Sequence, residues 1–205
     1  MCLCVEKTNM KRILSILALT IFLSACRSKQ DETKPHIIIQ TEKGDVEIEL
    51  YPLQAPKTVA AFLSYIDSGF YNNATFYRVL SNDNQPSNAP KTELIQGGIW
   101  RTRNRDSMRL EGIPHESTAQ THILHKDGVL SLARLEPGTG TTEFFICIGD
   151  QPGLDYGGEN VEDKQGYAAF GKVVKGMDIV LKIYRQSETD QYFDPPVAIY
   201  NIVRK

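Results

Sequence analysis

Hydrophobic and polar residues alternate in several short stretches of this chain. The clearest is VEIELY at residues 46–51, where apolar and acidic side chains alternate across VEIEL. A period of two is typical of a strand that buries one face. The preceding HIIIQT at 36–41 is joined to it by a turn containing Gly44, so the two stretches predict an antiparallel hairpin.

Six more apolar runs, each bounded by turn-forming residues, predict strands at 75–80, 94–99, 129–133, 144–149, 167–173 and 197–203. Two stretches instead repeat with a helical period, at 57–68 and 177–184. Eight short strands with only two helices favour a mainly β fold. We expect a closed eight-stranded antiparallel barrel, because closure removes the unpaired strand edges.

The N-terminal segment has the pattern of an export signal. Met10, Lys11 and Arg12 precede an apolar run at 13–23, which is too short to span a membrane. The run ends in Leu-Ser-Ala-Cys26, which resembles a bacterial lipobox and implies cleavage before Cys26 and lipidation of its thiol. An uncleaved anchor or an ordinary signal peptide is the alternative.

Three regions follow from this pattern. Residues 1–25 are predicted to be the signal segment, with Met10 a better start than Met1 because residues 1–9 would move the signal away from the terminus. Residues 26–35 are predicted to be the lipidated cysteine and a flexible charged tether. Residues 36–205 form one predicted domain, which we expect to be anchored by lipid in the bacterial cell envelope.

Composition narrows the function. The chain has 205 residues, of which 41% are hydrophobic, and a formal net charge of −2. This suits one globular domain and gives no reason to expect a nucleic-acid partner. Of the four cysteines only Cys147 lies in the predicted domain, so we expect no disulfide there and interpret Cys147 as a small buried hydrophobe.

The residue that most needs an explanation is Arg78, a charge within the apolar strand 75–80. Other chemistry is weakly indicated. His122 and His125 lack further ligands at metal spacing, and Ser131 lies in an apolar strand rather than on a sharp turn. We therefore expect neither a metal nor a cofactor. The basic segment 101–105 is expected to be a solvated loop, with an anion or nucleic-acid patch as the alternative.

Several short motifs carry a resemblance to a known family. They are FYRV from Phe76, IQGG from Ile95, GVLSLAR from Gly128, EFFIC from Glu143, Leu154-Asp155, and YAAFGKV from Tyr167. Each is weak alone, but together and in this order they resemble a cyclophilin-type peptidyl-prolyl cis-trans isomerase over about residues 36–205. The resemblance implies an eight-stranded barrel with a helix over each end.

The resemblance also implies roles for individual residues. Arg78 matches the catalytic arginine, Gln96 its partner, and Phe145 the floor of the proline pocket. The implied substrate-binding set is Phe76, Leu94, Ala133, Arg134, Glu143, Phe145, Leu154 and Tyr167. The expected partners are proline-containing peptides or unfolded proteins, the membrane through Cys26, and no second subunit.

The chain departs from the family pattern at several positions. Glu93 stands in place of a pocket aromatic, Glu143 in place of a common glutamine, and Tyr77 in place of a histidine. The loop at 81–91 is longer than usual. A non-catalytic prolyl-peptide binding module or chaperone is therefore the second hypothesis, and a purely structural envelope lipoprotein is the third.

Overall fold

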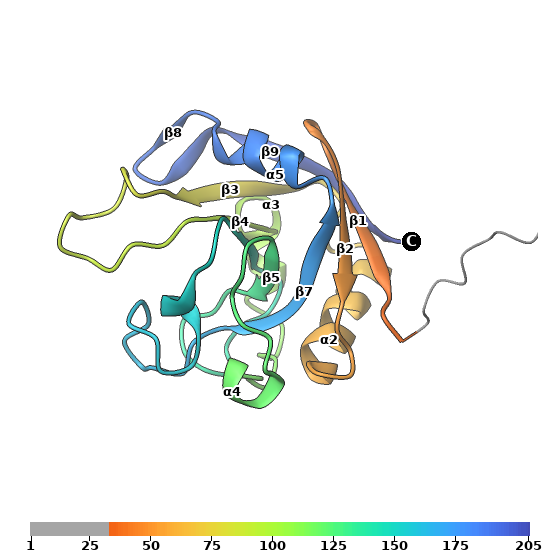
Figure 1. Ribbon diagram of the computed structural model, residues 1–205. Helices are drawn as coiled ribbons and strands as arrows, with labels where there is room; N and C mark the ends of the chain where they lie inside the picture. Colours follow the sequence, from red (N-terminus) through yellow and green to blue (C-terminus); the bar gives the residue numbers. More distant parts are fainter. Residues whose placement is uncertain (1–32) are drawn as a thin grey trace, which may run out of the picture. The chain divides into compact units, whose positions relative to one another are not determined.

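The computed structural model describes residues 33–205, apart from the side chains of Asn104 and Ser107 (Figure 1). The predicted signal segment, the lipidation site at Cys26 and most of the tether lie outside these residues. Within residues 33–205 no helix is both long enough and apolar enough to cross a membrane.

The described residues form a closed antiparallel barrel. The strands are β1 (His36–Thr41), β2 (Gly44–Leu50), β3 (Ala74–Leu80), β4 (Leu94–Gly98), β5 (Val129–Leu132), β6 (Phe144–Cys147), β7 (Ala168–Lys175), β8 (Glu188–Thr189) and β9 (Tyr192–Arg204). Their order is β1-β2-β7-β5-β6-β4-β3-β9, and β9 pairs with β1 to close the ring. β8 pairs with β9 outside the barrel. The predicted eight-stranded barrel is confirmed.

Two helices contribute to the barrel interior. These are α2 (Pro56–Asp67) and α5 (Met177–Tyr184), which lie at different ends of the barrel in Figure 1. α2 places Phe62 in the interior and α5 places Ile183 there, because apolar residues recur along one face of each helix. Both helices were predicted from this period.

The segment expected to be a basic loop is helical instead. α3 (Trp100–Ser107) is kinked at Arg103, whose backbone is non-helical. Arg103 donates from its guanidinium to the carbonyls of Gly69 and Asn72, which holds the segment against the connection between α2 and β3. Its sequence is almost entirely polar and therefore has no apolar period to indicate a helix. Two other short elements, α4 (Thr118–Thr121) and the 3₁₀ turn η2 (Pro152–Leu154), were also not predicted.

The barrel wall separates two apolar clusters. On β6, Phe144 and Ile146 face the interior, where Phe144 makes edge contacts with Phe62. The alternate residues Phe145 and Cys147 face outward and form a smaller cluster with Leu94 and Leu154. Strand alternation therefore creates an apolar surface outside the barrel, and the candidate site lies on it.

An irregularity in β3 decides which way Arg78 points. Phe76 pairs with Gly97 of β4, whereas Arg78 pairs with the adjacent Gln96, so Tyr77 is an extra residue in the strand. Such a bulge reverses the alternation that follows it. Phe76 and Val79 consequently both face the interior, and Arg78 lies on the outer face.

Removing a ring from the interior tests the role of α2. We expect Phe62→Ala to lower the free energy of unfolding by about 3–5 kcal/mol, because Phe62 is fully buried against three aromatic rings. Leu53→Ala is the control, since Leu53 is 78% exposed. Urea denaturation measures both, and equal effects would contradict this description of the core.

Candidate active site

Four strands place the site residues in one row. Arg78 on β3 is the register partner of Gln96 on β4, which is the partner of Phe145 on β6. Phe145 in turn lies opposite Ser131 on β5. Neighbouring strands are about 4.8 Å apart, so residues distant in sequence become side-by-side neighbours across the sheet.

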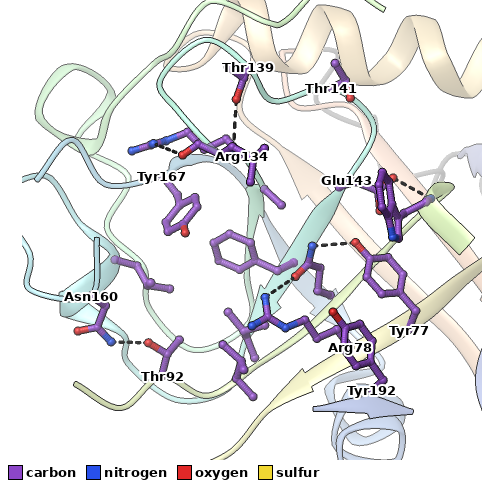
Figure 2. Close-up of a pocket in the computed structure, with 18 of the residues that line it drawn as sticks. Tyr77, Arg78, Thr92, Arg134, Thr139, Thr141, Glu143, Asn160, Tyr167 and Tyr192 are labelled. Atoms are coloured by element: carbon purple, nitrogen blue, oxygen red, sulfur yellow. Dashed lines mark hydrogen bonds between the residues drawn. The ribbon is translucent and has the colours of Figure 1, made fainter. Parts of the chain in front are cut away.

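A cavity of about 730 Å³ lies over this row (Figure 2). Such a volume is in the range of small-ligand clefts. Figure 2 shows Arg78 and Tyr77 on one side of the cavity and Tyr167 and Arg134 on the other. The sequence-predicted residues that line it are Arg78, Leu94, Gln96, Ala133, Arg134, Glu143, Phe145, Leu154 and Tyr167.

Phe76 is the exception, and its assignment to substrate binding is corrected. Its side chain is fully buried and makes an edge contact with Phe144 in the barrel interior. It does not line the cavity, because it lies before the bulge at Tyr77 and so faces the opposite side from Arg78.

The guanidinium of Arg78 is held by two glutamines. Its Nη1 donates to Gln96 Oε1 over a long 3.4 Å, and its Nη2 donates to Gln191 Oε1 at 2.8 Å. Gln96 is oriented in turn by donating from Nε2 to the hydroxyl oxygen of Tyr77 at 2.8 Å. Both partners of the guanidinium are neutral, so its positive charge is not cancelled. Arg78 Nε has no hydrogen-bond acceptor among the described residues.

Phe145 forms an apolar surface at the base of the cavity. The ring of Tyr167 meets it edge-on at 5.2 Å between centroids, and Leu94 and Leu154 pack around it. The imidazole of His125 stacks on the ring at 5.9 Å with an angle of 16° between the planes. Packing on several sides restricts the rotamer of Phe145 and gives the surface a fixed shape.

A buried network of hydrogen bonds among three side chains supports Phe145. The Asp155 carboxylate and the Ser131 hydroxyl lie 2.7 Å and 2.9 Å from the two ring nitrogens of His125. The sequence indicated no partner for Asp155, and the structure supplies one. This order of groups is that of a hydrolase triad, but Ser131 is fully buried and His125 almost fully. This hydrogen-bonded network therefore serves to fix the imidazole of His125 against the ring of Phe145.

His122, by contrast, is exposed and is not part of this hydrogen-bonded network. Among residues 33–205 no group of three or more His, Cys, Asp and Glu side chains is arranged to hold a metal ion. Cys147 is fully buried, as expected, and burial raises the pKa of its thiol.

Arg134 is fixed at the far rim of the cavity. Its guanidinium forms two hydrogen bonds with Asp163, donates to the carbonyl of Gly166, and lies 5.2 Å from the centre of the Tyr167 ring. The side chain is only 2% exposed. These contacts orient Tyr167 at the cavity wall.

Glu143 is a partly buried carboxylate at the cavity wall. Its Oε1 accepts hydrogen bonds from the backbone N–H groups of Ile99 and Trp100, at the start of α3. Its Oε2 has no donor among the described residues. Burial raises the pKa of Glu143, although interaction with the Tyr77 hydroxyl and the hydrogen bonds from Ile99, Thr142 and Trp100 oppose this. Burial also raises the pKa of the nearby Tyr77, with the charge of Glu143 adding to the effect.

Several functional positions were not identified from the sequence. Trp100, Met108, Leu110 and Tyr192 line the cavity, and their only signal was an apolar residue within a polar segment. Glu93, which stands in place of a pocket aromatic, does not line the cavity. It accepts a hydrogen bond from the hydroxyl of Tyr184 on α5.

The raised pKa of Glu143 predicts a pH dependence of stability. A carboxyl group with a raised folded pKa binds its proton more tightly when folded, so stability falls as the pH rises from the ordinary value through the folded value. We expect Glu143→Gln to be more stable than the wild type at pH 7, with the difference shrinking towards pH 4. Urea denaturation from pH 4 to 7 measures this. The exposed Glu162→Gln is the control, and a Glu143→Gln variant that is destabilised at every pH would contradict the assignment.

Comparison with known proteins agrees with this site. Residues 36–204 match the family model described as cyclophilin type peptidyl-prolyl cis-trans isomerase/CLD. Peptidyl-prolyl cis-trans isomerase A of Dickeya dadantii is 31% identical over 179 residues, covering 87% of this chain and 84% of the relative. Peptidyl-prolyl cis-trans isomerase B of Escherichia coli is 34% identical over 148 residues, covering 72% and 82%.

Solved structures show the same fold. The crystal structure of a Cryptosporidium parvum cyclophilin type peptidyl-prolyl cis-trans isomerase matches with a TM-score of 0.64 and 23% identity, over 84% of this chain and 98% of the other. The same protein in the presence of the dipeptide Ala-Pro matches with a TM-score of 0.63. By its family model, its relatives and its fold, this chain belongs to the cyclophilin-type peptidyl-prolyl cis-trans isomerases.

Proposed function

We propose that this protein is a peptidyl-prolyl cis-trans isomerase in which Arg78 stabilises the twisted prolyl amide. Family membership supports the isomerase activity and its action on proline-containing peptides. The observation that supports the role of Arg78 is its position: a charged guanidinium with neutral partners beside a cavity whose base is the apolar surface of Phe145, Leu94 and Leu154.

The chemistry requires little more than this arrangement. Rotation about a peptide bond faces a barrier of about 18–20 kcal/mol, because resonance gives the C–N bond partial double-bond character. When the amide twists, that resonance is lost and the lone pair becomes localised on the prolyl nitrogen, which can then accept a hydrogen bond. A donor aimed at this nitrogen binds the twisted amide more strongly than the planar one, so it lowers the barrier.

Each side chain has a part in this step. The prolyl ring would lie on Phe145 between Leu94 and Leu154, which fixes one side of the rotating bond. Arg78 would donate to the prolyl nitrogen, and Gln96 would hold the guanidinium in place. No group needs to exchange a proton with the substrate.

Substitution of Arg78 tests the mechanism. We expect Arg78→Ala to lower kcat/KM for a proline-containing peptide by about 100-fold, because it removes the donor made for the transition state. Arg78→Lys should also be impaired, since an ammonium lacks the planar fork. The exposed Arg185→Ala is the control and should keep full activity. Full activity in Arg78→Ala would overturn the mechanism.

The second hypothesis is a non-catalytic module that binds prolyl peptides in the same cavity. The observation that favours it is Glu93, which turns towards Tyr184 and leaves the cavity without the usual aromatic. The same experiment separates the two. Peptide binding without any wild-type turnover would support the module, whereas turnover that is lost in Arg78→Ala while binding persists would exclude it.

We further propose that the protein is an exported, lipid-anchored monomer that assists folding in the bacterial cell envelope. The support is sequence alone: a basic start, the apolar run at 13–23 and Cys26 in a lipobox-like context. A lipid at Cys26 would tether the domain through residues 27–35.

Cys26→Ser tests the anchor. We expect the full chain, produced in a bacterium with labelled fatty acid, to incorporate label and to sediment with membranes, and Cys26→Ser to do neither, because the thiol is the acceptor. Cys147→Ser is the control, since Cys147 is buried in the domain. Equal labelling of the wild type and Cys26→Ser would contradict lipidation at this residue.

A further inference from the structure

The geometry points to Gln191 as a second positioning residue for Arg78, one that ties the catalytic arginine to the β8–β9 hairpin and to the 81–91 loop. This inference rests on the proposed function. Gln191 lies 113 positions along the chain from Arg78, just before β9. It does not line the cavity, so it would act through the arginine and not on the substrate.

The two glutamines hold different ends of the guanidinium. Gln191 Oε1 accepts from Nη2 at 2.8 Å, whereas Gln96 Oε1 accepts from Nη1 at 3.4 Å, near the limit for a hydrogen bond. The contact with Gln191 is therefore the tighter of the two. Because a guanidinium is planar, two acceptors at separate nitrogens fix both its direction and its rotation.

Gln191 is itself fixed by three further contacts. Its backbone N–H donates to the Glu188 carboxylate at 2.7 Å, and its carbonyl accepts from the N–H of Val79, next to Arg78, at 2.8 Å. Its side-chain Nε2 donates to the carbonyl of Asn84 at 3.2 Å. Asp190 and Gln191 form the two-residue turn between β8 and β9, and both have a positive φ, 52° and 72°, as a tight hairpin turn of this kind requires.

The contact with Asn84 extends this arrangement into the 81–91 loop, which lies on the same side of the barrel as β8 in Figure 1. Asn84 caps its own turn through hydrogen bonds with Ser81 and Val79. Gln85 then bridges the carbonyls of Ser81 and Thr92. The long loop is therefore hydrogen-bonded back to both of its ends, and Gln191 connects it to Arg78. A rigid support of this kind is what holds a catalytic group in its productive geometry.

The test combines a side-chain series with a change of background. Gln191→Leu removes both hydrogen bonds at nearly constant volume, and Gln191→Glu restores an acceptor for Arg78. Gln186→Leu is the matched control, because the side chain of Gln186 donates to the carbonyl of Lys182 on the preceding helix and not to the site. Each variant of the full chain is compared with the wild type for kcat/KM on a proline peptide, for peptide Kd by NMR titration, and for thermal stability.

We expect Gln191→Leu to lower kcat/KM about tenfold, the effect of losing one hydrogen bond to a charged group. Peptide Kd should stay within about twofold, because the apolar contacts are untouched. Gln191→Glu should not recover the lost rate, because its carboxylate would orient the guanidinium but cancel its charge. In an Arg78→Ala background, Gln191→Leu should change the residual rate by less than about twofold, since a residue that acts through Arg78 has nothing left to position.

Other outcomes overturn the inference. An unchanged kcat/KM in Gln191→Leu would show that the contact has no part in positioning. The inference would also fail if Gln191→Leu lowered kcat/KM to the same extent in the Arg78→Ala background, or if Gln186→Leu lowered kcat/KM as much as Gln191→Leu does. Either result would indicate a general effect on the hairpin. An inactive wild type would instead overturn the proposed isomerase function, so the two failures are distinguishable.

Discussion

The bulge at Tyr77 is the constraint on which the site depends. Side chains alternate strictly along a regular strand, and Phe76 faces the interior. If this sequence formed a strand without a bulge, Arg78, two residues further on, would therefore also face the barrel core. A charge among buried aromatic rings is strongly destabilising unless it is paired. The bulge places Arg78 on the outer face instead, where it meets Gln96 and a cavity.

The second requirement is that the charge of Arg78 remains available. Its bound partners are the amide oxygens of Gln96 and Gln191, which orient the guanidinium without neutralising it. The nearby carboxylate of Glu143 is occupied at Oε1 by the N–H groups of Ile99 and Trp100. Backbone donors thus hold the negative group, and neutral acceptors hold the positive one. Under the proposed mechanism, this separation would favour the electrostatic stabilisation of a twisted amide.

Much of the support lies outside the barrel. The hydrogen-bonded network of His125, Asp155 and Ser131 supports the apolar surface formed by Phe145. Arg134 forms an ion pair with Asp163 and orients the ring of Tyr167 on the opposite wall of the cavity. The loops that bring these groups together pack on a second, smaller apolar cluster, so the barrel provides both an interior core and an outer binding surface.

The sequence by itself determined the eight strands of the barrel and the two amphipathic helices, because burial imposes a local period. It also singled out Arg78, because a charge in an apolar strand interrupts that period. It did not reveal the bulge, so Phe76 was assigned to the wrong side of the strand, and it did not indicate α3, which has no apolar face. Nor did it show Gln191 beside Arg78. Contacts between polar side chains distant in sequence leave no periodic signal, and only the tertiary structure brings such residues within hydrogen-bonding distance.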